Sequence, residues 1–201
     1  APQAAAAPPS NSIAPAQPPG LPQPPAASTP AASVPPASVQ EPIFVASAGD
    51  TQVLGGGSSD PMFRDQAPEG GLLVGLDVQI GNPFNSVQLV TPVFRNARGE
   101  EVVGRQHGQQ RQKAAGARAK EGYAVGGIIV KAGLLVDGLS IVFMRVKGDA
   151  LDPSDSYESE WLGGMGGNAK TKLAGDGRAV IALIGRYKGT ELMGIGLSTK
   201  E

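Results

Sequence analysis

Apolar and polar residues alternate with a period of two in three separate stretches of the chain. The apolar members are Val87 and Leu89 in the first stretch, Leu139, Ile141 and Phe143 in the second, and Met193, Ile195 and Leu197 in the third. A period of two predicts a β-strand with one buried face. An apolar run and a glycine-containing turn precede each stretch, so each is predicted to end a pair of strands.

The chain shows no apolar stripe at helical spacing with capping residues. Residues 109–120 (QQRQKAAGARAK) have helical propensity, but they lack an apolar face wide enough to pack on a core. This segment is therefore predicted to be a polar hairpin excursion. The 29 glycines suit a fold with many tight turns, and the expected class is all-β.

The three strand pairs belong to a repeat, and a glycine-bearing loop precedes each pair at a similar distance. The strand pairs occupy residues 70–96, 121–148 and 175–201, and the loops occupy residues 54–63, 103–112 and 162–171. Three sheets packed in a ring would give each unit the neighbour it needs to bury its apolar face. The sequence thus favours a β-prism, and a general β-sandwich is the alternative.

Residues 1–40 differ in composition from the rest of the chain. They hold most of the prolines and no charge. Proline lacks the N–H donor that a strand needs, and such a segment has too few apolar residues to bury a core. We expect a disordered, extended linker at 1–40, which could contact another domain or protein, and a folded domain at 41–201. A simple solvated terminus is the alternative for 1–40.

Composition and charge narrow the function classes. The net charge of −1 argues against a nucleic-acid binder, and no apolar run approaches the roughly 20 residues that span a bilayer. The absence of cysteine excludes disulfides and thiolate chemistry, and a single histidine excludes multi-histidine metal sites. No cofactor or metal is expected. No acid/base pair supports catalysis, so an enzyme ranks third among the functions considered.

Three further features are interpreted as structural rather than functional. His107 lies among polar residues and is expected to be exposed. The acidic residues 149–160 lack the ligand spacing of an EF-hand and are expected to form a solvated loop. Trp161 precedes a glycine-rich loop, where it could cover a sugar face or, as we favour, be a buried anchor at the start of a strand.

Two segments resemble the jacalin-like lectins. Residues 161–200, WLGGMGGNAKTKLAGDGRAVIALIGRYKGTELMGIGLSTK, resemble the opening of such a domain, with a GGxGG loop, an acidic turn and paired strands. Residues 133–143, GLLVDGLSIVF, resemble its closing turn, which carries a GxxxD sugar-binding motif. The opening-like segment comes last, as a threefold repeat allows. The resemblance covers residues 41–201, and it implies a β-prism of three Greek-key, four-stranded sheets with pseudo-threefold symmetry. The chain also resembles uncharacterised domains of exported bacterial proteins of planctomycete type.

The resemblance also implies a site, because family members hold a sugar between the GxxxD turn and the glycine-rich loop next in cyclic order. Carried onto this chain, the carbohydrate-binding residues are Gly133, Leu134, Leu135, Val136, Asp137, Gly163, Gly164, Gly166, Gly167 and Asn168. A carboxylate accepts strong hydrogen bonds from adjacent sugar hydroxyls. Glycines let the backbone approach the sugar ring closely.

The other two turns depart from the motif. The first begins at Gly81 and has Asn85 in place of the aspartate, and the third has the longer side chain of Glu191. Gly81, Asn85 and Glu191 are therefore weaker candidates. The aliphatic residues of the GxxxD turn also suit a structural or protein-contact role.

The sequence thus predicts a non-catalytic carbohydrate-binding module, with a glycan or polysaccharide as the ligand. A protein-interaction or scaffold module of the same fold is the alternative. The resemblance and the start at Ala1-Pro2-Gln3, which suits a processed chain, favour an exported protein of the cell envelope or exterior.

Overall fold

A computed structural model describes residues 48–201, apart from Pro83 and Gln112. Within these residues the structure has fourteen strands and no helix. They are β1 (Leu54–Gly55), β2 (Met62–Gln66), β3 (Leu72–Gly81), β4 (Ser86–Arg95), β5 (Glu101–Val103), β6 (His107–Gly108), β7 (Lys113–Arg118), β8 (Tyr123–Ala132), β9 (Val136–Lys147), β10 (Ala150–Glu158), β11 (Leu162–Gly163), β12 (Thr171–Ala174), β13 (Val180–Lys188) and β14 (Glu191–Thr199). The predicted linker at 1–40 and the predicted boundary at Glu41 lie outside the described residues.

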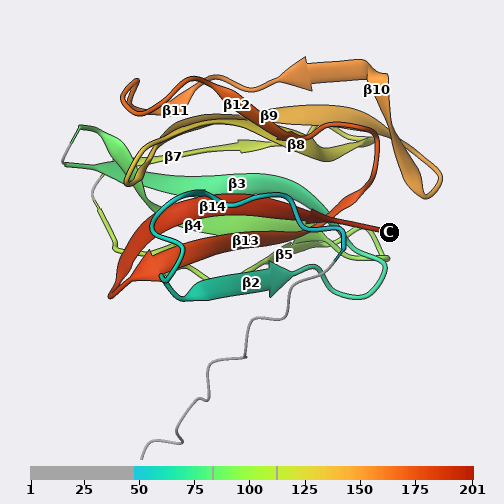
Figure 1. Cartoon of the computed structure of the whole chain (residues 1–201). Coiled ribbons are helices and arrows are strands. Elements are labelled where there is room, and N and C mark those ends of the chain that lie inside the picture. Colours follow the sequence, from blue (N-terminus) through green and yellow to red (C-terminus); the bar gives the residue numbers. More distant parts are fainter. Residues whose placement is uncertain (1–47, 83, 112) are drawn as a thin grey trace, which may run out of the picture. The chain divides into compact units, whose positions relative to one another are not determined.

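The strands form three antiparallel sheets. Sheet A has the order β1-β14-β13-β2, sheet B has the order β5-β4-β3-β7, and sheet C has the order β10-β9-β8-β12. The two-residue strands β6 and β11 also pair with β4 and β9. Each predicted strand pair forms the centre of one sheet, as Figure 1 shows. The predicted β-prism is confirmed, and the two-sheet sandwich is not formed.

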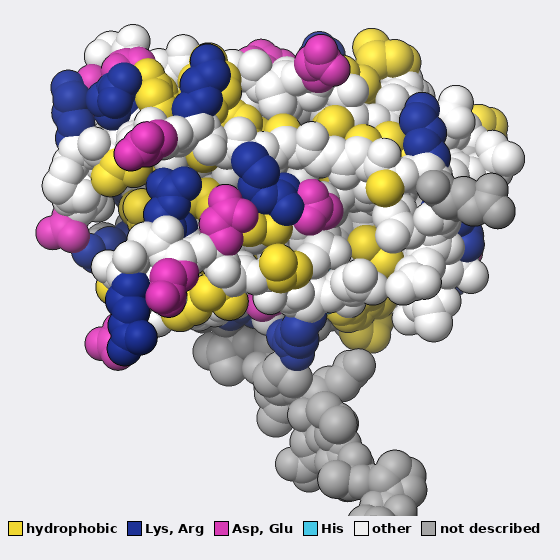
Figure 2. All heavy atoms as spheres, turned by 180° about the vertical axis from the view of Figure 1, so that it is seen from behind, with side chains coloured by type: hydrophobic (Ala, Val, Ile, Leu, Met, Phe, Trp, Pro, Cys, Tyr) yellow, Lys and Arg dark blue, Asp and Glu magenta, His cyan; other side chains and the backbone are white. Residues whose placement is uncertain are grey.

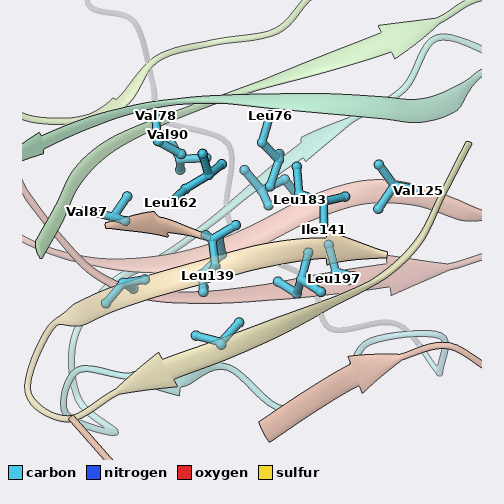
Figure 3. Packing of buried hydrophobic residues seen from close by; sticks show 14 of the residues in the cluster. Leu76, Val78, Val87, Val90, Val125, Leu139, Ile141, Leu162, Leu183 and Leu197 are labelled. Atoms are coloured by element: carbon cyan, nitrogen blue, oxygen red, sulfur yellow. The ribbon is translucent and has the colours of Figure 1, made fainter. Parts of the chain in front are cut away.

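Apolar side chains from all three sheets meet at the centre of the prism. Leu76 and Val90 come from sheet B, Ile141 comes from sheet C, and Leu183 and Leu197 come from sheet A, all fully buried. Figure 3 shows these side chains pointing toward one another between the sheets. The strand alternation predicts this arrangement, since one face of each strand pair must be buried.

Two segments differ from the sequence-based expectation. The acidic residues 149–160 are not a loop, because they include the nine-residue edge strand β10. Alternation explains the strand: Leu151 is buried, and the ring of Tyr157 lies 5.0 Å from that of Phe143. Asp152 and Ser156 flank an irregularity in the pairing, which accommodates the intervening proline. Likewise, the segment 109–120 includes the edge strand β7, which pairs with β3.

The surface carries charges of both signs. Figure 2 shows lysine and arginine side chains interspersed with aspartate and glutamate over one face. Three of the surface ion pairs are Arg118–Asp77 (2.6 Å), Arg145–Asp155 (2.5 Å) and Lys147–Asp152 (2.5 Å). Ion pairs at the surface contribute little stability each.

Candidate functional site

The three central strand pairs turn at the same end of the prism, opposite the C-terminus (Figure 1). Just after each turn, one residue of the outgoing strand has no partner across the pair. In sheet C this residue is Asp137, because Ala132 pairs with Val136 and Lys131 pairs with Gly138. The same register shift leaves out Gln88 in sheet B and Met193 in sheet A. A β-bulge redirects the side chain at such a position.

Each bulged residue faces a glycine with a positive φ. The pairs are Gly55 with Met193 (φ +92°), Gly108 with Gln88 (φ +120°) and Gly163 with Asp137 (φ +104°). A Cβ at any of these glycines would lie under 3.0 Å from the carbonyl oxygen of its partner, closer than real Cβ atoms come. Only glycine fits this approach. The repeated contact shows that the three glycine-bearing loops are equivalent.

This register corrects the equivalence drawn from sequence. Asn85 and Glu191 do not correspond to Asp137, since the residues at its position are Gln88 and Met193. The turns differ in length: Gly81 pairs with Ser86, whereas Lys188 pairs with Glu191. Aligning the repeats by the first polar residue after each turn therefore shifts the register.

The structure brings the Gly133–Asp137 turn and the Gly163–Asn168 loop together. The N–H of Gly164 donates to the carbonyl of Asp137 (2.8 Å), and the N–H of Asn168 donates to the carbonyl of Ala132 (3.2 Å). Gly166 and Gly167 lie against the Asp137 carboxylate, so that a Cβ on either would lie 2.5 Å from Oδ1 or Oδ2 respectively. The backbone of these two glycines thus borders the carboxylate on the side of the loop.

The Asp137 carboxylate has no hydrogen-bond donor among the residues that the structure describes. Asp137 is only 7% exposed, but its carboxylate oxygens are not completely shielded from solvent. Gly166, Gly167 and Asn168 beside it are exposed. A largely buried carboxylate needs hydrogen-bond donors to offset its lost hydration. Water or the hydroxyls of a ligand can supply these hydrogen-bond donors.

Polar contacts hold the glycine-rich loop in position. The indole N–H of Trp161 donates to the carbonyl of Gly164 (2.8 Å), and Nζ of Lys131 donates to the carbonyl of Met165 (2.6 Å). Nζ of Lys170 lies 4.5 Å above the Trp161 ring. Trp161 therefore holds the loop just before β11, from a half-buried position rather than the buried one expected from the sequence.

The aliphatic residues of the turn separate into two groups. Leu134 is 84% exposed, whereas the side chain of Val136 is fully buried in the core. Val136 therefore has a structural position and is not open to a ligand. Met165 in the loop and Phe84 in the neighbouring turn are also exposed. The backbone of Gly164 lies against the Phe84 carbonyl, so the turn that carries Phe84 lies beside the loop.

The equivalent positions in the other two sheets offer no open carboxylate. Gln88 is 3% exposed and donates from Nε2 to Oγ of Ser86 (2.6 Å), while Oε1 accepts from Nη2 of Arg111 (3.3 Å). Met193 is apolar and buried. Of the weaker candidates, Asn85 is exposed beside the Gly164 backbone, and Gly81 packs against the side chain of Arg111. Glu191 is exposed and pairs across its turn with Lys188.

His107 is buried, contrary to the expectation from sequence, with 2% of its surface exposed. Its Nδ1 lies 2.5 Å from Oη of Tyr187, its Nε2 lies 3.1 Å from Oδ2 of Asp65, and its ring stacks on Phe63 at 3.9 Å. The equivalent residue is a leucine in each of the other two repeats, Leu54 and Leu162. An alignment of the three loops indicates that the position of His107 is buried, since an apolar residue precedes the glycine in the other two loops.

No family model matches the sequence, and no curated protein sequence matches it. Solved structures do match. The agglutinin of Calystegia sepium has a TM-score of 0.58 at 12% identity, over 79% of this chain and 99% of that chain. Artocarpin, in a complex with mannotriose, has a TM-score of 0.57 at 13% identity, over 76% and 97%. The chain has the fold of the jacalin-like lectins. A prostate-specific WGA16 glycoprotein lectin also matches, with a TM-score of 0.52 at 15% identity, over 76% of this chain and 98% of that chain.

Three related sheets make up the jacalin-like fold of this chain. Of these, only sheet C combines the GxxxD turn with an intact GGxGG loop. Within the described part of the chain, no helix is long and apolar enough to cross a membrane.

Proposed function

We propose that this protein is a non-catalytic carbohydrate-binding module and that Asp137, with the loop from Gly163 to Asn168, holds the sugar. The observation that carries the proposal is the Asp137 carboxylate, which is recessed under two glycines and lacks a donor among the described residues. Neighbouring sugar hydroxyls supply two donors at a spacing that suits the two oxygens of one carboxylate, and bonds to a charged acceptor are the stronger ones.

The rest of the site supports a sugar as the ligand. The loop is exposed at Gly166 and Gly167, where the missing side chains let the backbone lie close to the Asp137 carboxylate. Leu134 in the turn and Met165 in the loop expose apolar side chains. A sugar ring has both hydroxyl groups and apolar C–H faces, so a recessed acceptor beside exposed aliphatic groups matches its chemistry.

Proteins of similar structure support the ligand class. Artocarpin was crystallised with mannotriose, with mannopentose and with a methyl α-mannoside, and the lectin from Champedak is described as mannose-binding. We extend carbohydrate binding from these proteins to this chain, without a specific sugar. A place on an exported or cell-surface protein is part of the same proposal.

A scaffold role is the second candidate, because the exposed side chains of Phe84, Leu134 and Met165 lie around the same loop. Exposed apolar groups that gather at one place indicate an interaction surface. This role needs no carboxylate, so replacement of Asp137 separates the two functions.

The test is a glycan array with the full chain, followed by titration of the best glycan against wild type, Asp137→Asn and Asp137→Ala. Loss of the charged acceptor should weaken binding about tenfold to hundredfold. Glu121→Gln, an exposed residue in the turn before β8, is the matched control and should bind like wild type. Equal affinities for wild type and both Asp137 variants would exclude this site, and an array without any bound glycan would favour the scaffold role.

A further inference from the structure

A second concave site lies at the opposite end of the prism from Asp137. It is a cavity of about 330 Å³. The turns at 66–72 and 146–151 form two of its walls, and Ala179, Ile181 and Lys200 form the third. The site includes Leu151 and Ala179, which are buried, and Leu72, Val146 and Ile181, which are half-buried. The surface of the cavity is therefore mainly apolar.

The charged residues of this cavity lie at its rim. Nζ of Lys200 is 3.2 Å from Oδ1 of Asp149, and both side chains are more than half exposed. Glu69 is exposed as well. An apolar interior with a thin charged rim suits an apolar side chain better than a charged ligand.

The described chain begins beside this cavity. The carbonyl of Gly49 accepts hydrogen bonds from the N–H (2.9 Å) and Oγ1 (3.1 Å) of Thr199. The next residue, Lys200, donates its N–H to the carbonyl of Ala179 (2.8 Å), and both line the cavity. Because Asp50 pairs antiparallel with Ser198, and Gly49 bonds to Thr199, the described chain begins level with Lys200, which lines the cavity.

The pseudo-threefold repeat shows what is different at this point. In sheet B a short turn at 96–100 joins β4 to β5, and in sheet C a turn at 148–149 joins β9 to β10. In sheet A the corresponding strands β14 and β1 are not consecutive in the chain, so no short turn joins them among the described residues.

The segment before Ala48 has a suitable sequence. Ile43, Phe44 and Val45 are the one run of three large apolar residues in 1–47, where other large apolar residues stand singly among proline, alanine and polar residues. An extended chain spans at most about 3.3–3.6 Å per residue, so Val45 reaches up to about 14 Å from Gly49. We propose that Ile43, Phe44 and Val45 bind in this cavity of their own chain.

The cavity lies at the end of the prism opposite the Asp137 turn, so it is separate from the proposed sugar site. The inference rests on the cavity and on the path of the chain, and it holds whether or not the protein binds a sugar.

Cysteine cross-linking tests the proposal, because the chain has no cysteine of its own. The full chain with Val45→Cys and Ala150→Cys should form an intramolecular disulfide at least tenfold faster than two matched controls. One control moves the first cysteine upstream, as Val39→Cys with Ala150→Cys. The other moves the second cysteine to the exposed β7 residue Ala114, near the opposite end, as Val45→Cys with Ala114→Cys.

A stability measurement gives a second, independent readout. Phe44→Ser in the full chain should lower Tm on the order of 5 °C, whereas Leu21→Ser, a matched change in the proline-rich segment, should leave Tm unchanged. Equal cross-linking rates for all three pairs would overturn the proposal. Cross-links that join two copies instead of one chain would overturn it as well.

Discussion

The imidazole Nε2 of His107 lies 3.1 Å from Oδ2 of Asp65, and this contact joins strand β6 of sheet B to strand β2 of sheet A. Both side chains are buried. Asp65 also accepts the backbone N–H of Arg105 (2.6 Å), so it holds the loop that carries the histidine at two points. A polar contact between sheets thus replaces the leucine that the other two repeats have at this position.

Replacement of His107 by leucine should destabilise the domain even though leucine suits the repeat. The Asp65 carboxylate would stay buried without its imidazole donor, which costs about 2–3 kcal/mol of unfolding free energy for a charged group. Urea denaturation of wild type and His107→Leu measures the change.

The control for this prediction neutralises the partner. In the double variant His107→Leu with Asp65→Asn, the buried charge is gone, so the combined loss should be smaller than the sum of the two single losses. Additive losses would show that the two side chains do not interact in the folded protein.

The phenol of Tyr123 should titrate at a higher pH than an ordinary tyrosine. Its hydroxyl donates to Oδ1 of Asp155 (2.6 Å), and this hydrogen bond, together with burial, raises the pKa of Tyr123. The stability from a raised pKa is complete below the unfolded pKa of about 10 and is lost as pH rises through the folded pKa. Absorbance titration of the phenolate, with Tyr123→Phe to assign the signal, measures the pKa.

Asp155→Asn is the informative variant, because it removes the acceptor charge and keeps the shape of the side chain. The pKa of Tyr123 should fall in this variant, since Nη2 of Arg145 also contacts the phenol (2.9 Å) and favours the phenolate. An unchanged titration curve would contradict the assigned cause.

Gly163→Ala should destabilise the protein more than an alanine at another glycine of positive φ. Gly163 has φ +104°, and a Cβ there would lie 2.6 Å from the Asp137 carbonyl oxygen. Gly99 has φ +85° with nothing within 4 Å, so Gly99→Ala measures backbone strain alone. We expect a loss of about 1 kcal/mol for Gly99→Ala and about 2–4 kcal/mol for Gly163→Ala.

Thermal denaturation of both alanine variants checks this difference. Similar losses in the two proteins would mean that the loop can move away from Asp137, and the close approach would then not be a requirement of the repeat.

The repeat and the position of the candidate site could be predicted from the sequence because both depend on local patterns. Alternation marks the strands that fill the core, such as the one with Ile141, and the GxxxD and GGxGG motifs mark two loops that the fold then brings together. Local spacing is enough here, since the repeat fixes which loop follows which turn.

Other features depend on contacts between distant residues and were missed for that reason. The equivalence of Asp137 with Gln88 and Met193 follows from strand register, and turns of unequal length conceal it. The burial of His107 depends on Asp65 and Tyr187, which are 42 and 80 residues away. Nothing near His107 in the sequence indicates either partner.

Gly166→Ala should weaken glycan binding while the fold stays intact. The φ of Gly166 is not positive, so alanine causes no backbone strain of that kind. Its Cβ, however, would lie 2.5 Å from Oδ1 of Asp137, where the proposed sugar hydroxyl binds. The nearest atom is the end of a side chain and the loop is exposed, so a shift of roughly 1 Å relieves the contact, and we expect a Tm within about 2 °C of wild type. The lost hydrogen bond should reduce affinity at least about tenfold.

Gly57→Ala is the matched control for Gly166→Ala. Gly57 lies just after β1, in the equivalent loop of sheet A, and a Cβ there would have its nearest atom at 3.5 Å, which is an ordinary contact. The two variants add the same methyl group to related loops, and only one of them adds it beside Asp137. Titration of the array-selected glycan should therefore give wild-type affinity for Gly57→Ala and reduced affinity for Gly166→Ala. Full affinity in Gly166→Ala would place the sugar away from the Asp137 carboxylate, because a ligand bound there could not avoid the added carbon.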